Sequence, residues 1–178
     1  MIEIESKYFI DELSEEVEDL IKDADYKSIV QSYLLVQDNH EIRIRIEWWN
    51  NNFIYQFTHK IKKGEDREEY NIDLTLEEYT QLRKDIYPKI VKTRYMINDG
   101  YNVILVDKYR DFDFFIAEIE FQNKIEQYFY DPPLFLKCSD GIIHNVSKDE
   151  EFKDSYFAKN QDKISKEYLK EQLGIGNL

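Results

Sequence analysis

The chain has 178 residues, a length typical of a single domain that buries a sizeable core. Its 37 acidic residues outnumber its 24 lysines and arginines, and the net charge of −13 argues against a general binder of nucleic acids or anionic membranes. The single cysteine, Cys138, excludes an internal disulfide and a zinc site built from thiolates.

The first predicted strand covers residues 2–10, where Glu3, Glu5 and Lys7 alternate with apolar or small residues. Because successive side chains of a strand point to opposite faces, this alternation predicts a strand with one charged face. Comparable patterns separated by turn residues predict further strands at 29–38, 41–48, 53–62, 67–73, 91–97, 101–109 and 113–122. Short links such as "NDG" at 98–100 are hairpin signals, so neighbouring strands are expected to be antiparallel.

The predicted helices are few and lie mainly toward the ends of the chain. Spaced apolar residues predict a helix at 11–24, and Thr75 with Glu78 forms a capping box that predicts another at 74–88. After a proline-containing loop at 131–141, a C-terminal helical segment is predicted at about 147–173. Because no linker or internal repeat interrupts the pattern, residues 1–178 are interpreted as one domain.

These elements predict a mainly β fold in which eight antiparallel strands close into a barrel or tunnel with a few flanking helices. Closure removes exposed strand edges, and an eight-stranded barrel has an interior just wide enough for its side chains or one small ligand. The charged faces of the strands could form either a solvated exterior or the lining of the tunnel. The opposite faces carry residues such as Ile42, Ile44 and Ile46, which would suit helices and loops packed outside, and this favours a charged lining.

Cations and carboxylates alternate along these charged faces. The residues concerned are Glu3, Glu5, Lys7, Glu41, Arg43, Arg45, Lys60, Lys62, Arg67, Glu69, Lys92, Arg94, Glu118 and Glu120. Buried cations need carboxylates or a bound polyanion beside them, because an isolated buried charge costs on the order of several kcal/mol. Arginine and lysine suit phosphate oxygens, and glutamates are hard oxygen ligands for Mg²⁺ or Mn²⁺. The pattern therefore predicts a site for a chain of phosphates with a divalent metal.

Five segments carry a resemblance to a known family: "EIESK" at 3–7, "IVQSYL" at 29–34, "IRIR" at 42–45, "KTRY" at 92–95 and "AEIEF" at 117–121. In this order they resemble the E-x-E-x-K signature and the later strands of the triphosphate tunnel metalloenzymes, also called the CYTH superfamily. The resemblance covers residues 2 to about 158. It implies an antiparallel tunnel that binds triphosphate compounds with a divalent metal and usually hydrolyses them.

The resemblance also implies roles for individual residues. The metal ligands would be Glu3, Glu5, Glu69, Glu118 and Glu120, and the catalytic group would be Glu3, Glu5, Lys7, Glu118 and Glu120. Phosphates would be held by Lys7, Arg43, Arg45, Lys60 or Lys62, Arg67, Lys92 and Arg94. Two features depart from the family pattern. Asn71 stands where members often have a carboxylate, and the C-terminal "HNVSKDEEFKD", with Ser147 and Asp154, matches only loosely.

The expected reaction is phosphoryl transfer to water from inorganic tripolyphosphate or a nucleoside triphosphate, catalysed by placement and electrostatics. The alternatives are a class IV-type adenylyl cyclase, a thiamine triphosphatase and a non-catalytic module that binds polyphosphate or nucleotides. Trp49 shares the strand face of Arg43 and Arg45 and is interpreted either as a stacking platform for a base or thiamine ring or as an ordinary rim residue.

The expected partner is a small polyanionic substrate rather than a macromolecule. No apolar run approaches the roughly 20 residues of a membrane span, and the acidic N-terminus lacks the layout of a signal peptide. We therefore expect a cytoplasmic protein with no membrane or nucleic-acid partner. A homodimer is left open.

Overall fold

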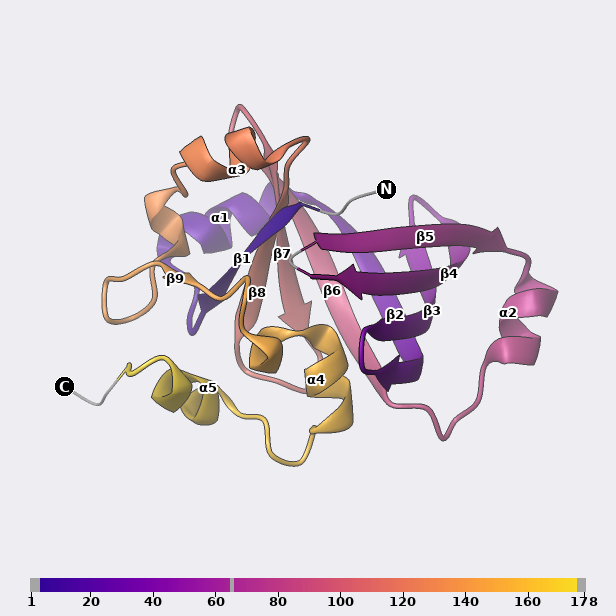
Figure 1. Cartoon of the computed structure of the whole chain (residues 1–178). Helices are drawn as coiled ribbons and strands as arrows, with labels where there is room; N and C mark the ends of the chain where they lie inside the picture. The colour runs from indigo at the N-terminus through magenta and orange to yellow at the C-terminus, as the bar shows by residue number, and fades with distance from the viewer. Residues whose placement is uncertain (1–3, 65, 176–178) are drawn as a thin grey trace.

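The computed structural model describes residues 4–64 and 66–175, which contain one antiparallel sheet of nine strands and five α-helices (Figure 1). The strands are β1 (Glu5–Ile10), β2 (Asp25–Gln37), β3 (His40–Trp49), β4 (Asn52–Lys63), β5 (Asp66–Leu74), β6 (Lys89–Asn98), β7 (Val103–Tyr109), β8 (Phe115–Glu120) and β9 (His144–Asn145). The helices are α1 (Glu15–Asp23), α2 (Leu76–Leu82), α3 (Lys124–Phe129), α4 (Asp154–Lys159) and α5 (Lys166–Gln172), with 3-10 turns η1 (Leu134–Leu136) and η2 (Glu150–Phe152).

The local signals in the sequence explain most of these elements. All eight predicted strands are present, and the link between β3 and β4 is a tight turn in which Asn50 and Asn51 both have positive φ, at 48° and 62°. The predicted capping box at Thr75 and Glu78 starts α2. Helix α3, which begins after the cap residue Asn123, and the two-residue strand β9 were not predicted.

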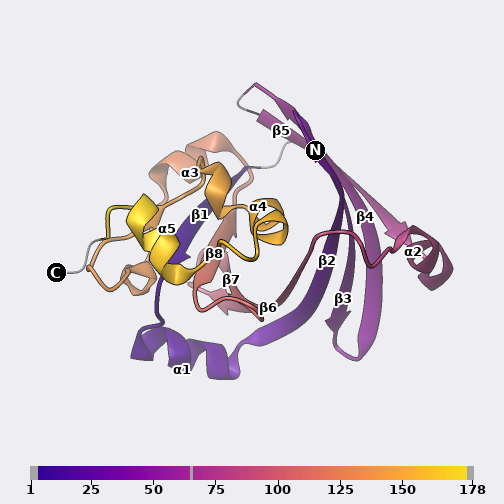
Figure 2. The same cartoon turned by 90° about the horizontal axis from the view of Figure 1, so that it is seen from below.

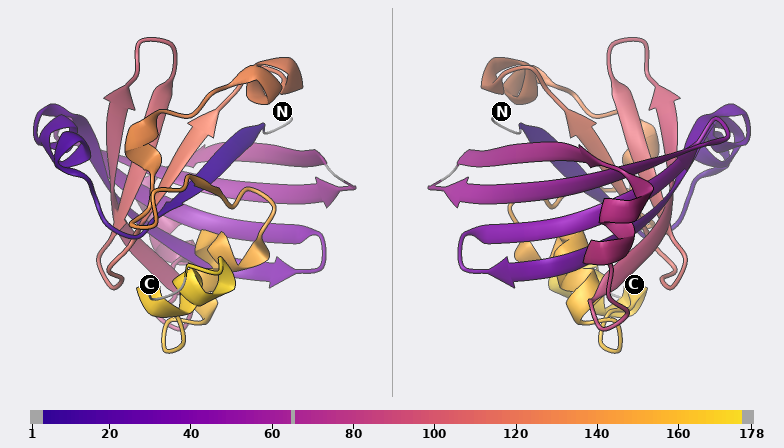
Figure 3. Two further views of the ribbon diagram at one scale, coloured as in Figure 1. Left: turned by 90° about the vertical axis from the view of Figure 1, so that its left-hand side faces the viewer. Right: turned by 90° about the vertical axis from the view of Figure 1, so that its right-hand side faces the viewer.

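The strand order is β5-β4-β3-β2-β6-β7-β8-β1-β9, and the sheet curves strongly around one concave face (Figures 2 and 3). The mainly β class is confirmed, and the described residues contain no strand pairing that joins β5 to β1, so they do not show the predicted closure into a barrel. The C-terminal segment occupies the edge of β1 instead. Strand β9 pairs with Tyr8 and Phe9, and the Lys7 backbone N–H donates to Ser147 Oγ at 2.8 Å. The Arg67 side chain of β5 and the Glu5 side chain of β1 approach each other, with their Nη1 and Oε1 atoms 3.4 Å apart.

The concave face of the sheet is apolar at one end and charged at the other. At the apolar end, Phe9, Ile90 and Tyr109 pack against Phe157 of α4 and Leu169 of α5. A second apolar cluster covers the opposite face of β7 and β8 and includes Val17 of α1 and Leu136 of η1. Helix α4 lies inside the curve of the sheet, and α5 lies over its β1 and β8 end (Figure 2). They fill one end of its concave side and leave the charged end as a cavity.

Among residues 4–64 and 66–175, no helix combines the length and the apolar character needed to cross a membrane.

Candidate functional site

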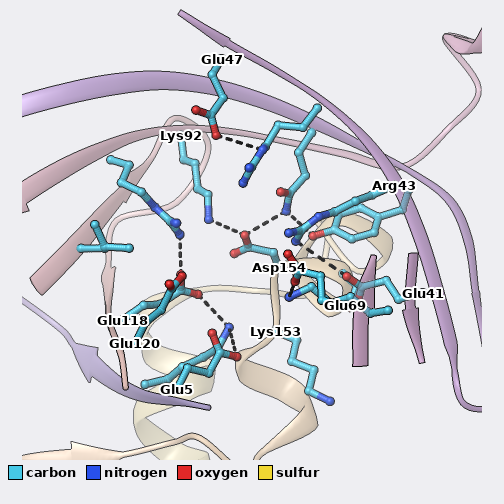
Figure 4. Close-up of a pocket in the computed structure, with 18 of the residues that line it drawn as sticks. Glu5, Glu41, Arg43, Glu47, Glu69, Lys92, Glu118, Glu120, Lys153 and Asp154 are labelled. Carbon is cyan, nitrogen blue, oxygen red and sulfur yellow. Dashed lines mark hydrogen bonds and ion pairs between the residues drawn. The ribbon is translucent and has the colours of Figure 1, made fainter. Parts of the chain in front are cut away.

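The charged end of the concave face is a cavity of about 220 Å³, here called the central cavity (Figure 4). It brings together most of the site residues predicted from the sequence: Glu5, Lys7, Arg43, Arg45, Lys60, Arg67, Glu69, Lys92, Arg94, Glu118 and Glu120. Glu3 lies outside the described residues. Lys62 does not line this cavity. Its side chain is 52% exposed, whereas that of Lys60 is only 10% exposed and has its Nζ atom 2.8 Å from Glu69 Oε2.

Strand register explains why these side chains meet. Lys7 of β1 is paired with Glu118 of β8, and Glu5 is paired with Glu120, so both pairs project from the same face. Each strand therefore contributes alternate residues to the cavity. The orientation with the charges on the concave face is the one that the structure adopts.

The wall formed by β1, β8 and β6 is an ion-pair network centred on Glu118. Its Oε1 atom lies 2.7 Å from Lys7 Nζ, and its Oε2 atom lies 2.5 Å from Arg94 Nη2. Burial opposes ionisation of this carboxyl, but Lys7 and then Arg94 outweigh burial and hold the pKa of Glu118 well below its usual range. Glu118 is therefore an anion whose two oxygens are both engaged by cations.

A second network surrounds the buried ammonium of Lys92. The Lys92 Nζ atom lies 2.5 Å from Asp107 Oδ2 and 2.5 Å from Asp154 Oδ2. Asp154, the first residue of α4, also accepts hydrogen bonds from the Tyr109 hydroxyl at 2.6 Å and from Gln31 Nε2 at 3.0 Å. Burial opposes ionisation of Asp154, but Lys92 outweighs it and lowers the pKa of Asp154 to about 2. The C-terminal helix thus inserts a carboxylate among the cations of the cavity.

The two arginines of β3 form the opposite wall. Arg45 Nη2 donates to Gln56 Oε1 at 2.8 Å and its Nε lies 3.0 Å from Glu47 Oε1, whereas Arg43 Nη1 lies 3.8 Å from Glu41 Oε1. The buried Nε of Arg43 has no hydrogen-bond partner within the described part of the chain. Burial and then the neighbouring Arg43 lower the pKa of Arg45. Both observations indicate that this wall can bind an anion, which would accept hydrogen bonds and reduce the repulsion between the two arginines.

Comparison with solved structures supports the same architecture. No family model matches the sequence, and no curated protein matches it. The inorganic triphosphatase NE1496 is similar in structure, with a TM-score of 0.56 at 20% identity over 88% of this chain and 93% of that chain. The PH1012 protein from Pyrococcus horikoshii OT3 aligns at TM-score 0.53 and 17% identity, over 80% and 94% of the two chains. A Bacillus halodurans protein described as "a putative adenylate cyclase" aligns at TM-score 0.51 and 18% identity, over 74% and 92%.

The chain has the fold of the triphosphate tunnel metalloenzymes. In this chain the triphosphate tunnel fold takes the form of a curved sheet whose concave side is closed at one end by the C-terminal helices.

Several residues of this triphosphate tunnel fold line the cavity or support it but were not predicted from the sequence. Lys27, Gln31 and Tyr33 line the central cavity from β2, and Glu47 lines it from β3. The alternation that identified the other residues would have found them, because they occupy the same face of their strands. Strand alternation did not indicate Asp107 or Lys153. Asp107 forms an ion pair with Lys92, and Lys153 reaches the cavity from the C-terminal segment.

The carboxylates of this tunnel fold suit a divalent metal by donor chemistry. Glu5, Glu118 and Glu120 offer hard oxygens from two paired strands, which are donors that Mg²⁺ and Mn²⁺ prefer. As arranged here, the described residues contain no group of three or more acidic, histidine or cysteine side chains close enough to hold a metal ion. Lys7 and Arg94 hold the oxygens of Glu118, so metal ligation by Glu118 requires these cations to turn to another anion.

The depressed pKa of Glu69 predicts a loss of stability in acid. Burial opposes ionisation, but Lys60 outweighs it and lowers the pKa of Glu69 from 4.5 to about 2. Because the folded-state value is the lower one, the stabilisation is complete well above pH 4.5 and is lost as the pH falls toward 2. Between about pH 6 and about pH 3, wild type should lose roughly 2 kcal/mol more free energy of unfolding than Glu69→Gln.

Urea denaturation at both pH values measures this difference. The exposed Glu77→Gln variant is the matched control and should retain the acid sensitivity of wild type. Equal acid sensitivity of wild type and Glu69→Gln would show that the Lys60–Glu69 pair does not hold the carboxylate ionised.

Proposed function

We propose that the protein binds a linear triphosphate in the central cavity together with Mg²⁺ or Mn²⁺ and hydrolyses it to release phosphate. The observation that carries the proposal is the convergence of arginines and lysines from six strands, β1 to β6, with the carboxylates of β1 and β8 on one concave face. The structural likeness to an inorganic triphosphatase supports it. Cations outnumber carboxylates among the lining residues, although the whole chain is strongly acidic.

Binding would exchange internal ion pairs for contacts with phosphate. Arg43 and Arg94 present forked donors, and Lys7 and Lys60 present ammonium groups that now rest against Glu118 and Glu69. When these cations turn to phosphate oxygens, the carboxylates that they neutralised become available as metal ligands. Substrate and metal are therefore expected to bind together.

Catalysis would rest on placement and charge. Arg43, Arg45 and Arg94 would hold the triphosphate and stabilise the negative charge that develops on the transferred phosphoryl group. A divalent metal held by Glu5, Glu118 and Glu120 would supply charge neutralisation and orientation of phosphate oxygens. The buried walls of the cavity would exclude bulk water and so strengthen these electrostatic interactions.

The composition of the cavity favours inorganic tripolyphosphate over a nucleotide. Tyr33 supplies the aromatic ring among the described lining residues, and the other lining side chains are mainly charged. Trp49 is not among those lining residues, and the Lys27 ammonium lies 4.9 Å from the centre of its ring. The position of Trp49 therefore agrees better with an ordinary rim residue than with a stacking platform for a base.

A substrate panel tests the proposal. Purified protein with Mg²⁺ or Mn²⁺ should release phosphate from tripolyphosphate faster than from ATP, GTP or thiamine triphosphate, and chelation of the metal should abolish the release. Arg43→Ala should lower kcat/KM for tripolyphosphate by roughly 10- to 100-fold, because it removes charge-assisted hydrogen bonds. The matched control Arg83→Ala removes an arginine with a 59% exposed side chain at the C-cap of α2 and should change little.

Other outcomes of the panel would replace the proposal. Cyclic AMP and pyrophosphate from ATP would establish a cyclase. Binding of tripolyphosphate without turnover under any metal condition would establish a sensor. If tripolyphosphate does not bind with or without metal, the central cavity is not a polyphosphate site.

A further inference from the structure

A second and larger cavity adjoins the central one. It has a volume of about 480 Å³ and is called here the outer vestibule. Its lining consists of Ile4, Glu5, Lys62, Gly64, Arg67, Lys124, Gln127, Ser147, Lys148, Glu150 and Lys153. Glu5, Arg67 and Lys153 line both cavities, so the two are neighbours across these three side chains. In Figure 4, Lys153 extends from beside Asp154 toward the side of the central cavity where Glu5 lies.

The outer vestibule concentrates positive charge on an acidic protein. Its described lining contains five cations, which are Lys62, Arg67, Lys124, Lys148 and Lys153, against the carboxylates of Glu5 and Glu150. These cations come from the β4–β5 hairpin, from the start of α3 and from the segment after β9. Three parts of the chain that are distant in sequence thus contribute charge of one sign to one hollow.

Two lysines of the outer vestibule compete for one carboxylate. Glu150 Oε1 lies 2.5 Å from Lys153 Nζ and 3.7 Å from Lys62 Nζ, so one carboxylate is shared between two ammonium groups. Burial lowers the pKa of Lys153, and the charges of Arg67 and Lys62 lower it further, outweighing the opposing effect of Glu150. An anion at this place would relieve the repulsion.

The uncharged lining residues limit what kind of anion fits. They are Ile4, Gly64, Gln127 and Ser147, none of which offers an aromatic face for a base. A nucleoside attached to a triphosphate in the central cavity would find no stacking partner among these residues. Additional phosphates would find ammonium and guanidinium groups instead.

We propose that the outer vestibule binds the further phosphates of a linear polyphosphate longer than tripolyphosphate, while its terminal phosphates occupy the central cavity. This proposal rests on the proposed function of the central cavity. The side chains shared by the two cavities, Arg67 and Lys153, would contact the chain where it passes from one to the other. The ligand class is then inorganic polyphosphate in general, with tripolyphosphate as its shortest member.

Binding of two ligands by matched lysine variants tests the proposal. The ligands are tripolyphosphate and a purified linear polyphosphate of greater length, compared at equal concentration of chain ends and at fixed ionic strength. Lys124→Ala/Lys148→Ala removes two exposed lysines of the outer vestibule that do not line the central cavity. Lys84→Ala/Lys108→Ala removes two exposed lysines that line neither cavity and is the matched control.

Wild type should bind the longer chain more tightly than tripolyphosphate. Lys124→Ala/Lys148→Ala should weaken binding of the longer chain by roughly three- to tenfold and change tripolyphosphate binding and hydrolysis by less than about twofold. The control pair should change neither. Thermal unfolding of each variant without ligand verifies that the fold is intact.

Two results would overturn the proposal. One is equal affinity of wild type for both ligands, and the other is an equal effect of the vestibule substitutions on both. Failure of tripolyphosphate itself to bind wild type would instead overturn the function proposed for the central cavity, so the two failures can be told apart.

Discussion

Replacement of Glu118 and Glu120 by glutamine is expected to lower metal-dependent turnover of tripolyphosphate by about a hundredfold or more. Glutamine keeps the size and hydrogen-bonding atoms of each side chain but removes two negative charges from the wall that faces the phosphates. The metal loses two of its proposed ligands as a result. Steady-state hydrolysis at several Mg²⁺ and Mn²⁺ concentrations measures the effect.

The same substitution should affect substrate binding in the opposite direction. Lys7 and Arg94 would each lose the Glu118 carboxylate as a partner and so interact more strongly with phosphate oxygens, while Lys7 keeps Glu5 and Arg94 keeps Asp107. Affinity for tripolyphosphate without metal should therefore stay the same or increase, as measured by calorimetry. The control Glu16→Gln/Glu18→Gln alters two exposed glutamates of α1 and should leave both quantities unchanged. A folded Glu118→Gln/Glu120→Gln protein with undiminished turnover would show that these carboxylates are not metal ligands.

Lys92→Met is expected to destabilise the fold by roughly 3–5 kcal/mol, because it removes the cation from a buried ion-pair network. The Lys92 side chain is 2% exposed and that of Asp107 is fully buried. Asp107 keeps Arg94 as a partner, but Asp154 loses its cation and, within residues 4–64 and 66–175, keeps the hydrogen bonds from Tyr109 and Gln31. Urea denaturation measures the change, and Lys108→Met, at an exposed position of β7, is the control with an expected effect within about 0.5 kcal/mol.

A second substitution identifies the origin of this loss. Lys92→Met/Asp154→Asn removes the uncompensated charge together with the cation, so it should be more stable than Lys92→Met alone by about 1 kcal/mol or more. If Lys92→Met unfolds at the same urea concentration as wild type with the same slope, the network does not contribute to stability. If the double variant is no more stable than Lys92→Met, Asp154 is not the group left uncompensated.

The strands and the composition of the central cavity could be predicted from the sequence to a large extent. The alternation of Glu5 with Ser6 and of Arg43 with Ile44 is a property of one strand at a time, because backbone geometry alone sends successive side chains to opposite faces. Turn residues such as Asn50 and Asn51 fixed which strands are neighbours. These local patterns are sufficient to place charged residues of several strands on one common face.

The tertiary structure decided how that face is used. β9 and Ser147 occupy the edge of β1, and the sequence pattern of β1 does not indicate this pairing. The division of the concave face into an apolar end and a charged end depends on where α4 and α5 pack. The insertion of Asp154 beside Lys92, from 62 positions further along the chain, depends on the same packing.

Lys60 lines the central cavity and Lys62 does not, and strand alternation could not predict this difference within β4. Both lysines have the same parity on β4, so alternation assigns them to one face without distinguishing them. Their depths differ because Lys60 is opposite Glu69 inside the curve, whereas Lys62 lies at the rim beside Glu150. Strand alternation by itself determined which face of the sheet carries charge. How deeply each charge is buried, and against which partner, was decided only by the packing of segments distant in sequence, because burial depends on what covers a residue rather than on its neighbours along the chain.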